Sequence, residues 1–150
     1  MYRLSFNYVY NTIMETHCIL FGVVFINILY GIEYVGITGI NAIRKLLKEK
    51  QGHVKKAFYR KDIGYIDLFW GDSSAGLSHI VSQRRKDNMD VQQLLKDLPI
   101  VIKRGSLGVN ANSTDRENIF YKDKVIVITH ELRGESVTAI LTAFCKNRKV

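Results

Sequence analysis

The last third of the chain constrains the fold most strongly, because three strand-like runs follow one another there with two-residue turns between them. Residues 118–121 and 124–131 are separated by Lys122-Asp123, and the run 136–145 follows Arg133-Gly134. Runs rich in β-branched and aromatic residues that are divided by such short turns are typical of β-hairpins. Residues 118–145 are therefore expected to form an antiparallel sheet.

Helical periodicity dominates the residues that follow Gly39. An apolar stripe with spacings of three to seven residues predicts helix, and Gly52 is a candidate break between two helices. The stripe consists of Ile40, Ile43, Leu47, Val54 and Phe58. Residues 65–70 then predict a strand, and residues 77–86 a short helix.

A second capping pattern predicts one more helix before the strands. Asp90 and Gln93 resemble a capping box, in which the side chain of the first residue accepts the backbone N–H of the second. Pro99 is expected either to end this helix or to begin a new turn, and Gly105 to stop it. Helices followed by strands indicate the α+β class, with N-terminal helices packed on a C-terminal antiparallel sheet.

Residues 1–38 differ in character from residues 39–150, and we place a domain boundary between them. Arg3, Glu15 and Glu33 are the only charged side chains of the first segment except for His17. Its uncharged run, residues 19–32, is shorter than the roughly 18 residues typical of a spanning helix. Three interpretations stay open: a marginal membrane segment, a buried hairpin, or the remnant of a longer chain. We favour the last two and keep membrane association as the less favoured alternative.

The positive charge of the chain lies in residues 39–150. The formal net charge is +8, and the first 38 residues contribute none of that surplus. Such an excess attracts polyanions, of which RNA, DNA and anionic lipid are the obvious examples. A basic protein without a polyanionic partner is the plain alternative.

His79 is the most informative of the four histidines. At 100° per residue, Leu77, Ile80, Val81 and Arg84 share one face of the helix 77–86, and His79 points nearly opposite. A histidine on the polar face is either a solvated surface residue or a proton-transfer group. Its position just after a Gly-Asp-Ser-Ser corner in a basic chain favours the second interpretation.

The hairpin at Arg133-Gly134 places the other informative histidine. With a two-residue turn, Leu132 faces Glu135 and Val125 faces Thr142. One face then forms the core, with Ile126, Ile128, His130, Val137, Ala139 and Leu141. The half-polar face, a candidate binding face, carries Thr129, Glu131, Ser136, Thr138, Ile140 and Thr142. We interpret His130 as a structural residue away from the threonines, although a one-residue slip would reverse this.

Several classes of site are missing from the sequence. It contains no dinucleotide-binding or P-loop glycine motif and no pair of cysteines at metal-binding spacing. Cys18 and Cys145 lie far apart, so we expect a reducing compartment and no disulfide framework. His17 and His53 are interpreted as uninvolved, with His53 on a lysine-rich helix. A site without metal or cofactor, built from histidine, arginine, lysine and hydroxyl groups, is the hypothesis that remains.

Such a set of residues suits RNA cleavage. RNA supplies its own nucleophile, the 2′-hydroxyl, so the protein needs only proton-transfer groups and cations around the phosphate. A non-catalytic RNA- or DNA-binding module and a membrane-associated protein with a basic domain remain the alternatives.

Three short stretches of the sequence carry a family resemblance. They are residues 42–72, GLSHI at 76–80 and LTAF at 141–144. In this order and spacing, the chain from about Gly39 to Phe144 resembles the phage-type barnase–EndoU–colicin–RelE-like nuclease domains of bacterial toxin-like and mobile-element proteins. The resemblance implies a barnase-like α+β fold for residues 39–150 and a metal-independent endoribonuclease activity that leaves a 2′,3′-cyclic phosphate.

The resemblance also implies roles for three residues. His79 matches the motif histidine, a general base or acid, Thr142 matches the motif threonine, a phosphate contact, and Arg116 stands where a basic residue is expected. By charge alone, Arg84, Arg85 and Lys103 are expected to contact the RNA backbone. Ala139 departs from the pattern, because related domains often carry tryptophan there. RNA and a cognate inhibitor or immunity protein are the expected partners, and the cytoplasm, its own or that of a target cell, is the expected location.

Overall fold

The computed structural model describes residues 31–146, which form an α+β fold of three helices and a seven-stranded mixed sheet. The helices are α3 (Ile40–Glu49), α4 (Leu77–Lys86) and α5 (Val91–Arg104). The strands are β1 (Glu33–Tyr34), β2 (His53–Arg60), β3 (Gly64–Phe69), β4 (Ser106–Val109), β5 (Arg116–Tyr121), β6 (Lys124–Leu132) and β7 (Glu135–Cys145). Most of the apolar leader, with His17 and Cys18, lies outside the described residues. No helix within residues 31–146 is long and apolar enough to cross a membrane.

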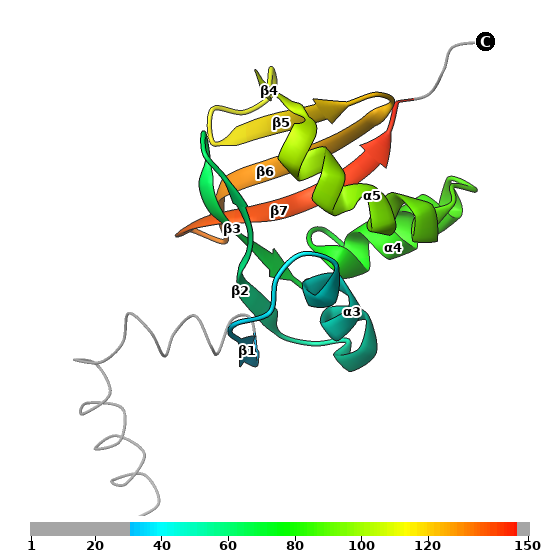
Figure 1. The fold of residues 1–150 in the computed structure, drawn as a ribbon, viewed down its shortest axis with the longest axis vertical. Helices are drawn as coiled ribbons and strands as arrows, with labels where there is room; N and C mark the ends of the chain where they lie inside the picture. The colour runs from blue at the N-terminus through cyan, green and yellow to red at the C-terminus, as the bar shows by residue number, and fades with distance from the viewer. Residues whose placement is uncertain (1–30, 147–150) are drawn as a thin grey trace, which may run out of the picture.

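The three helices pack on the sheet and enclose one hydrophobic core (Figure 1). The core joins helix residues such as Leu46, Ile80 and Leu98 to strand residues such as Ile66 and Ile126. We call the sheet face that carries Ile126 the helix face, and the opposite face the second face. The predicted α+β class is confirmed.

The sheet itself is larger and less regular than predicted. Its order is β1-β2-β3-β7-β6-β5-β4, so strands from both halves of the chain share it (Figure 1). β1 pairs with β2, and β3 with β7, in parallel, and the remaining neighbours are antiparallel. The expectation of a purely antiparallel C-terminal sheet is therefore wrong, although its three C-terminal strands are present.

Residues 53–60 form a strand, not the predicted second helix. Val54 and Phe58 both face the core, as the apolar stripe required. Four residues is close to one helical turn and also two periods of a strand, so this spacing fits both structures. The structure resolves the ambiguity at Lys50, whose left-handed backbone ends α3, and at Gly52, whose φ of +79° brings it against the carbonyl of Ile32. His53 accordingly lies on β2 and not on a helix.

α5 runs straight past Pro99. Asp90 accepts a hydrogen bond from the N–H of Gln93, and the N–H of Gly105 closes the helix on Val101, so both predicted ends are confirmed. The expectation that Pro99 ends or turns the helix is wrong. Six buried residues hold the helix to the core on both sides of the proline, which offsets the hydrogen bond that proline cannot donate. They are Val91, Leu94, Leu95, Leu98, Val101 and Ile102.

The β6–β7 hairpin has the predicted turn and an unpredicted register beyond it. Leu132 faces Glu135 as expected, but two irregularities shift the pairing, so that Val125 faces Phe144 and Val127 faces Thr142. Ile140 consequently belongs to the core and Leu141 does not, the reverse of the prediction. β-Bulges insert residues that the alternating pattern does not reveal, and each one moves the following side chains to the other face.

Candidate active site at the start of helix α4

His79 lies on the first turn of α4, off the stripe that Leu77 and Ile80 bury in the core. Its Nδ1 atom lies 2.7 Å from the backbone carbonyl oxygen of Ser73. Because a carbonyl oxygen only accepts, Nδ1 must carry the proton in this contact. In the neutral ring, Nε2 then holds the lone pair, and it has no hydrogen-bond partner within residues 31–146. This arrangement leaves a half-buried imidazole that can accept a proton.

The loop that holds His79 is organised by Asp72. This carboxylate accepts hydrogen bonds from the N–H of Ser74, at 2.7 Å, and from its hydroxyl, at 2.6 Å. It also forms an ion pair with Arg133 in the β6–β7 turn. The two bonds from Ser74, with a smaller contribution from Arg133, lower the pKa of Asp72 to about 2. The sequence marked the Gly-Asp-Ser-Ser corner as a turn, but it gave no sign of the contact with Arg133.

The start of α4 is attached to the edge of β7. β3 pairs with β7 at Asp67 and Ala139 and ends two residues later, and the N–H of Gly76 donates to the carbonyl of Leu141 at 2.9 Å. This bond joins the helix of His79 to the residue that precedes Thr142. The structure therefore brings the GLSHI and LTAF stretches together, although the joined residues Gly76 and Leu141 are 65 positions apart in the sequence.

Thr142 itself carries an unpaired buried hydroxyl. Its Oγ1 atom is shielded from solvent and has no hydrogen-bond partner within the described residues. A buried polar atom without a partner costs about 1–3 kcal/mol, so such atoms call for a physical reason. The predicted direct contact between this hydroxyl and a phosphate would need a local rearrangement that exposes the Oγ1 atom. No hydrogen bond joins Thr142 to His79.

Arg84 lies at the other end of the same contact between α4 and β7. Its guanidinium stands 5.9 Å from the ring centroid of Phe144, which shares the second face with Thr142, and it pairs with Asp87 at 2.9 Å. Its Nε atom is buried without a hydrogen-bond partner in residues 31–146. Arg84 is thus largely engaged inside the protein, and less available to an RNA backbone than its charge alone suggested.

Arg116 lies on the second face, as Thr142 does, but at a distance. It pairs with Thr129 of β6, which in turn faces Ala139 of β7. Two strand spacings separate β5 from β7, about 10 Å across the sheet. Arg116 is exposed on the sheet face that was expected to contact phosphate, and it does not touch His79.

The last two predicted cations do not join this group. Arg85 is exposed in the last turn of α4, beside a shallow pocket that Met89 and Leu95 also line. Lys103 is exposed at the end of α5, next to Tyr59 and Arg60 of the β2–β3 hairpin. The six predicted site residues are therefore spread over several surfaces. His79 and Arg84 lie on α4, the helix that contacts β7, and Thr142 lies on β7.

His130 occupies a different cluster from the one predicted. Its Nε2 lies 3.0 Å from the carboxylate of Glu117 and its Nδ1 3.2 Å from the hydroxyl of Thr138. The expectation that it lies away from the threonines is wrong, because the irregularity between Thr129 and Glu131 brings Thr138 beside it. The alternating pattern could not reveal this neighbour.

Neither a metal cluster nor a cysteine nucleophile stands out in the described part of the chain. Within residues 31–146, no group of three histidine, cysteine or acidic side chains could hold a metal ion. Cys145 is a free, half-buried thiol, and burial raises its pKa. A raised pKa reduces the thiolate fraction at neutral pH, which disfavours this residue as a nucleophile.

His79, with an available lone pair on the first turn of a helix in a basic α+β domain, is a candidate proton-transfer group. A model of the family described as phage-Barnase-EndoU-ColicinE5/D-RelE like nuclease 1 matches residues 57–150, more than half of the chain. The chain belongs to this phage-associated family of nuclease-like domains, and the resemblance is confirmed. No curated protein and no solved structure matches the chain.

The family match begins inside β2, whereas the predicted domain begins at Gly39. α3 precedes the match, yet Ala42, Ile43 and Leu46 belong to the same hydrophobic core as the matched strands. Removing α3 would expose that core, so residues before the match contribute to the stability of the fold.

Proposed function

We propose that the chain is a metal-independent endoribonuclease in which His79 is the general base. The observation that carries the proposal is the contact between Nδ1 of His79 and the carbonyl of Ser73, which leaves the Nε2 lone pair available. A neutral imidazole accepts protons efficiently near physiological pH. Membership of a nuclease-like family supports a nucleic acid as the substrate.

The proposed reaction needs one proton acceptor and a cationic surface. Nε2 of His79 takes the proton of a ribose 2′-hydroxyl, and the 2′-oxygen attacks the adjacent phosphorus. The bond from phosphorus to the 5′-oxygen breaks, and this oxygen leaves with a proton from water or a second acid. The products are a 2′,3′-cyclic phosphate and a 5′-hydroxyl. Exposed cations such as Arg85 and Arg116 stabilise charge on the strand.

A biological setting follows as part of the same proposal. The enzyme would act on RNA in the cytoplasm, either of its own cell or of a cell into which it is delivered. A toxin-like nuclease of this kind would need a cognate inhibitor or immunity protein, since RNA cleavage harms the cell that makes it. The positive net charge would favour an acidic partner surface.

A non-catalytic nucleic-acid-binding module is the second candidate, and two observations favour it. The Thr142 hydroxyl is buried, and Arg84 is engaged with Asp87 and Phe144. Neither group can contact a phosphate without rearrangement. Binding through the exposed cations would survive this arrangement, and it would weaken steeply with salt.

Incubation of the full chain with a single-stranded RNA oligonucleotide and its DNA counterpart, in excess chelator, tests the proposal. We expect RNA fragments that end in a 2′,3′-cyclic phosphate and intact DNA, because DNA lacks the 2′-hydroxyl. His79→Ala should slow cleavage by about 10²–10⁴-fold. Cleavage abolished by the chelator would contradict the metal-independent mechanism. Intact RNA with a salt-sensitive mobility shift would instead favour the binding module.

A further inference from the structure

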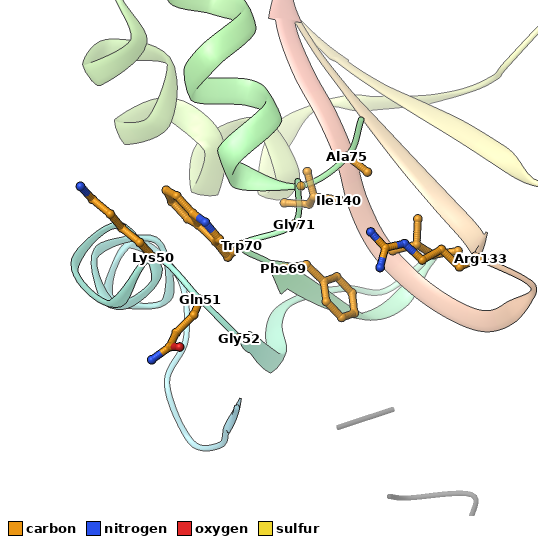
Figure 2. Close-up of a pocket in the computed structure, with 11 residues that line it drawn as sticks. Lys50, Gln51, Gly52, Phe69, Trp70, Gly71, Ala75, Arg133 and Ile140 are labelled. Atoms are coloured by element: carbon orange, nitrogen blue, oxygen red, sulfur yellow. The ribbon is translucent and has the colours of Figure 1, made fainter. Parts of the chain in front are cut away.

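A pocket of about 250 Å³ lies where β3 ends, between the end of α3 and the β6–β7 turn (Figure 2). None of the predicted site residues lines it. Its walls come from the end of α3, the segment that joins β3 to α4, and the β6–β7 hairpin. β3 and β7, which both contribute to the pocket, pair at Asp67 and Ala139.

The inner walls of this pocket are apolar and closely built. Phe69 and Ile140 are 2% and 1% exposed, and Trp70 is half-buried beside them. Gly52 and Gly71 also line the pocket, and a Cβ atom on either would collide with the carbonyl of Ile32 or Ala75, so both positions need glycine. Flat backbone and aromatic walls suit a planar ligand.

The rim of the pocket is polar and positively charged. Lys50, Gln51 and Arg133 are exposed there. Figure 2 shows Lys50 and Gln51 at the end of α3 and Arg133 on the other side of Phe69. The side chains that line the pocket include no carboxylate, although Arg133 also pairs with Asp72. A neutral planar group inside and an anionic group at the rim would therefore complement it.

We infer that this pocket holds one unstacked base of an RNA strand, with the neighbouring phosphates at Lys50 and Arg133. Sequence-specific RNA recognition commonly places splayed-out bases against aromatic side chains. Ala75 and Gly76 line the pocket and lead into α4, and His79 follows Gly76 by three residues, about 4.5 Å along the helix. The inference deepens the proposed function, because a base held here would bring its strand to His79.

The fluorescence of Trp70 provides a direct test, because it is the only tryptophan in the chain. We expect saturable quenching when the full-length protein is titrated with ribonucleoside 5′-monophosphates, since a stacked base quenches an indole. Ribose 5-phosphate should leave the fluorescence unchanged, because it lacks the base. Equal responses to both ligands, or no response to any monophosphate or to an RNA oligonucleotide, would overturn the inference.

Substitutions at the rim separate the base from its phosphate. Lys50→Met should weaken monophosphate binding by about fivefold and leave nucleoside binding unchanged, and Lys96→Met, on the exposed side of α5, is the matched control. Equal weakening by both substitutions would contradict a phosphate contact at Lys50. Ligand should quench the Trp70 fluorescence of the His79→Ala variant to the same extent as that of the parent protein. Quenching without any RNA cleavage would support the pocket and reject the nuclease, whereas cleavage without quenching would do the reverse.

Discussion

His79, on α4, and His130, on β6, differ in how their ring nitrogens are used. Nδ1 of His79 donates to a backbone carbonyl, and its Nε2 has no partner in the described residues. Both nitrogens of His130 are engaged, one with Glu117 and one with Thr138. A proton acceptor needs an available lone pair, so the partners of a histidine, more than its exposure, decide whether it can serve as a base.

The backbone near the two histidines also differs in how tightly it is surrounded. Gly76, before α4, has φ +88° and ψ −168°, a region that only glycine adopts readily, and the carbonyl of Phe69 lies close to it. Gly134, in the turn beyond His130, has φ +81° and open space around it. The start of α4, which carries His79, is therefore tightly constrained, as a preorganised site requires, and the turn beyond His130 is not.

The largest expected difference is in catalysis. His79→Ala should lower the rate of RNA cleavage by about 10²–10⁴-fold, whereas His130→Ala should lower it by less than about tenfold. Single-turnover cleavage of one oligonucleotide by each variant measures both effects. If His130→Ala were the more damaging change, the catalytic base would have to be sought in the Glu117 cluster.

Local sequence patterns predicted the parts of the fold that depend on them. Asp90, Gly105 and the Arg133-Gly134 turn act through backbone contacts within a few residues, and all three were placed correctly. Val54 and Phe58 were correctly assigned to the core, but their spacing fits helix and strand equally. Strand rather than helix forms here because these residues pair with β3, a contact that the local spacing does not contain.

The candidate site was predictable in its residue types more than in its geometry. His79 could be assigned to the polar face of its helix because helical periodicity fixes that direction. The bulges in β7 changed the neighbours of Ile140 and Thr138, and no residue type in the strand predicts these bulges. The contact of Asp72 with Arg133 joins residues 61 positions apart, which no local pattern encodes.

The second largest expected difference is in the stability that the protein loses when Gly76 or Gly134 is replaced by alanine. Gly76→Ala should lower the free energy of unfolding by about 3 kcal/mol, because it combines backbone strain with a collision against Phe69. Gly134→Ala adds strain without a collision and should cost about 1 kcal/mol. Chemical denaturation of both variants measures the difference. Equal losses would mean that the start of α4 is no more constrained than the hairpin turn.

Substitutions of two threonines on the second face should change the stability by smaller amounts and in opposite directions. Thr129 donates its hydroxyl to the carbonyl of Glu131 at 2.5 Å, whereas the hydroxyl of Thr142 is buried and unpaired. Thr129→Val should therefore destabilise the fold by about 1 kcal/mol, and Thr142→Val should stabilise it by up to about 1 kcal/mol. Thermal denaturation checks the signs. Destabilisation by Thr142→Val would show that its hydroxyl has a partner, and unchanged cleavage would contradict the phosphate contact that the sequence resemblance implies for Thr142.

The smallest effect concerns the pH dependence of the loop that holds His79. The pKa of Asp72, about 2, lies below its ordinary value of 3.8, mainly because Ser74 donates to the carboxylate. The folded state thus favours the ionised form, and the resulting stabilisation is complete above pH 3.8 and is lost as the pH falls through about 2. The difference in melting temperature between the protein and Asp72→Asn should be constant near neutral pH and shrink below about pH 4.

Arg133→Met separates the two sources of this shift. It removes the ion pair and keeps both hydrogen bonds from Ser74, which lower the pKa of Asp72 more than Arg133 does. Asp72 and Arg133 are both more than 40% exposed, so water and salt screen their attraction. The variant should therefore keep most of the pH dependence between pH 4 and 2. If the dependence disappeared with Arg133, the ion pair with the turn beyond His130, more than the hydrogen bonds from Ser74, would hold the His79 loop in place.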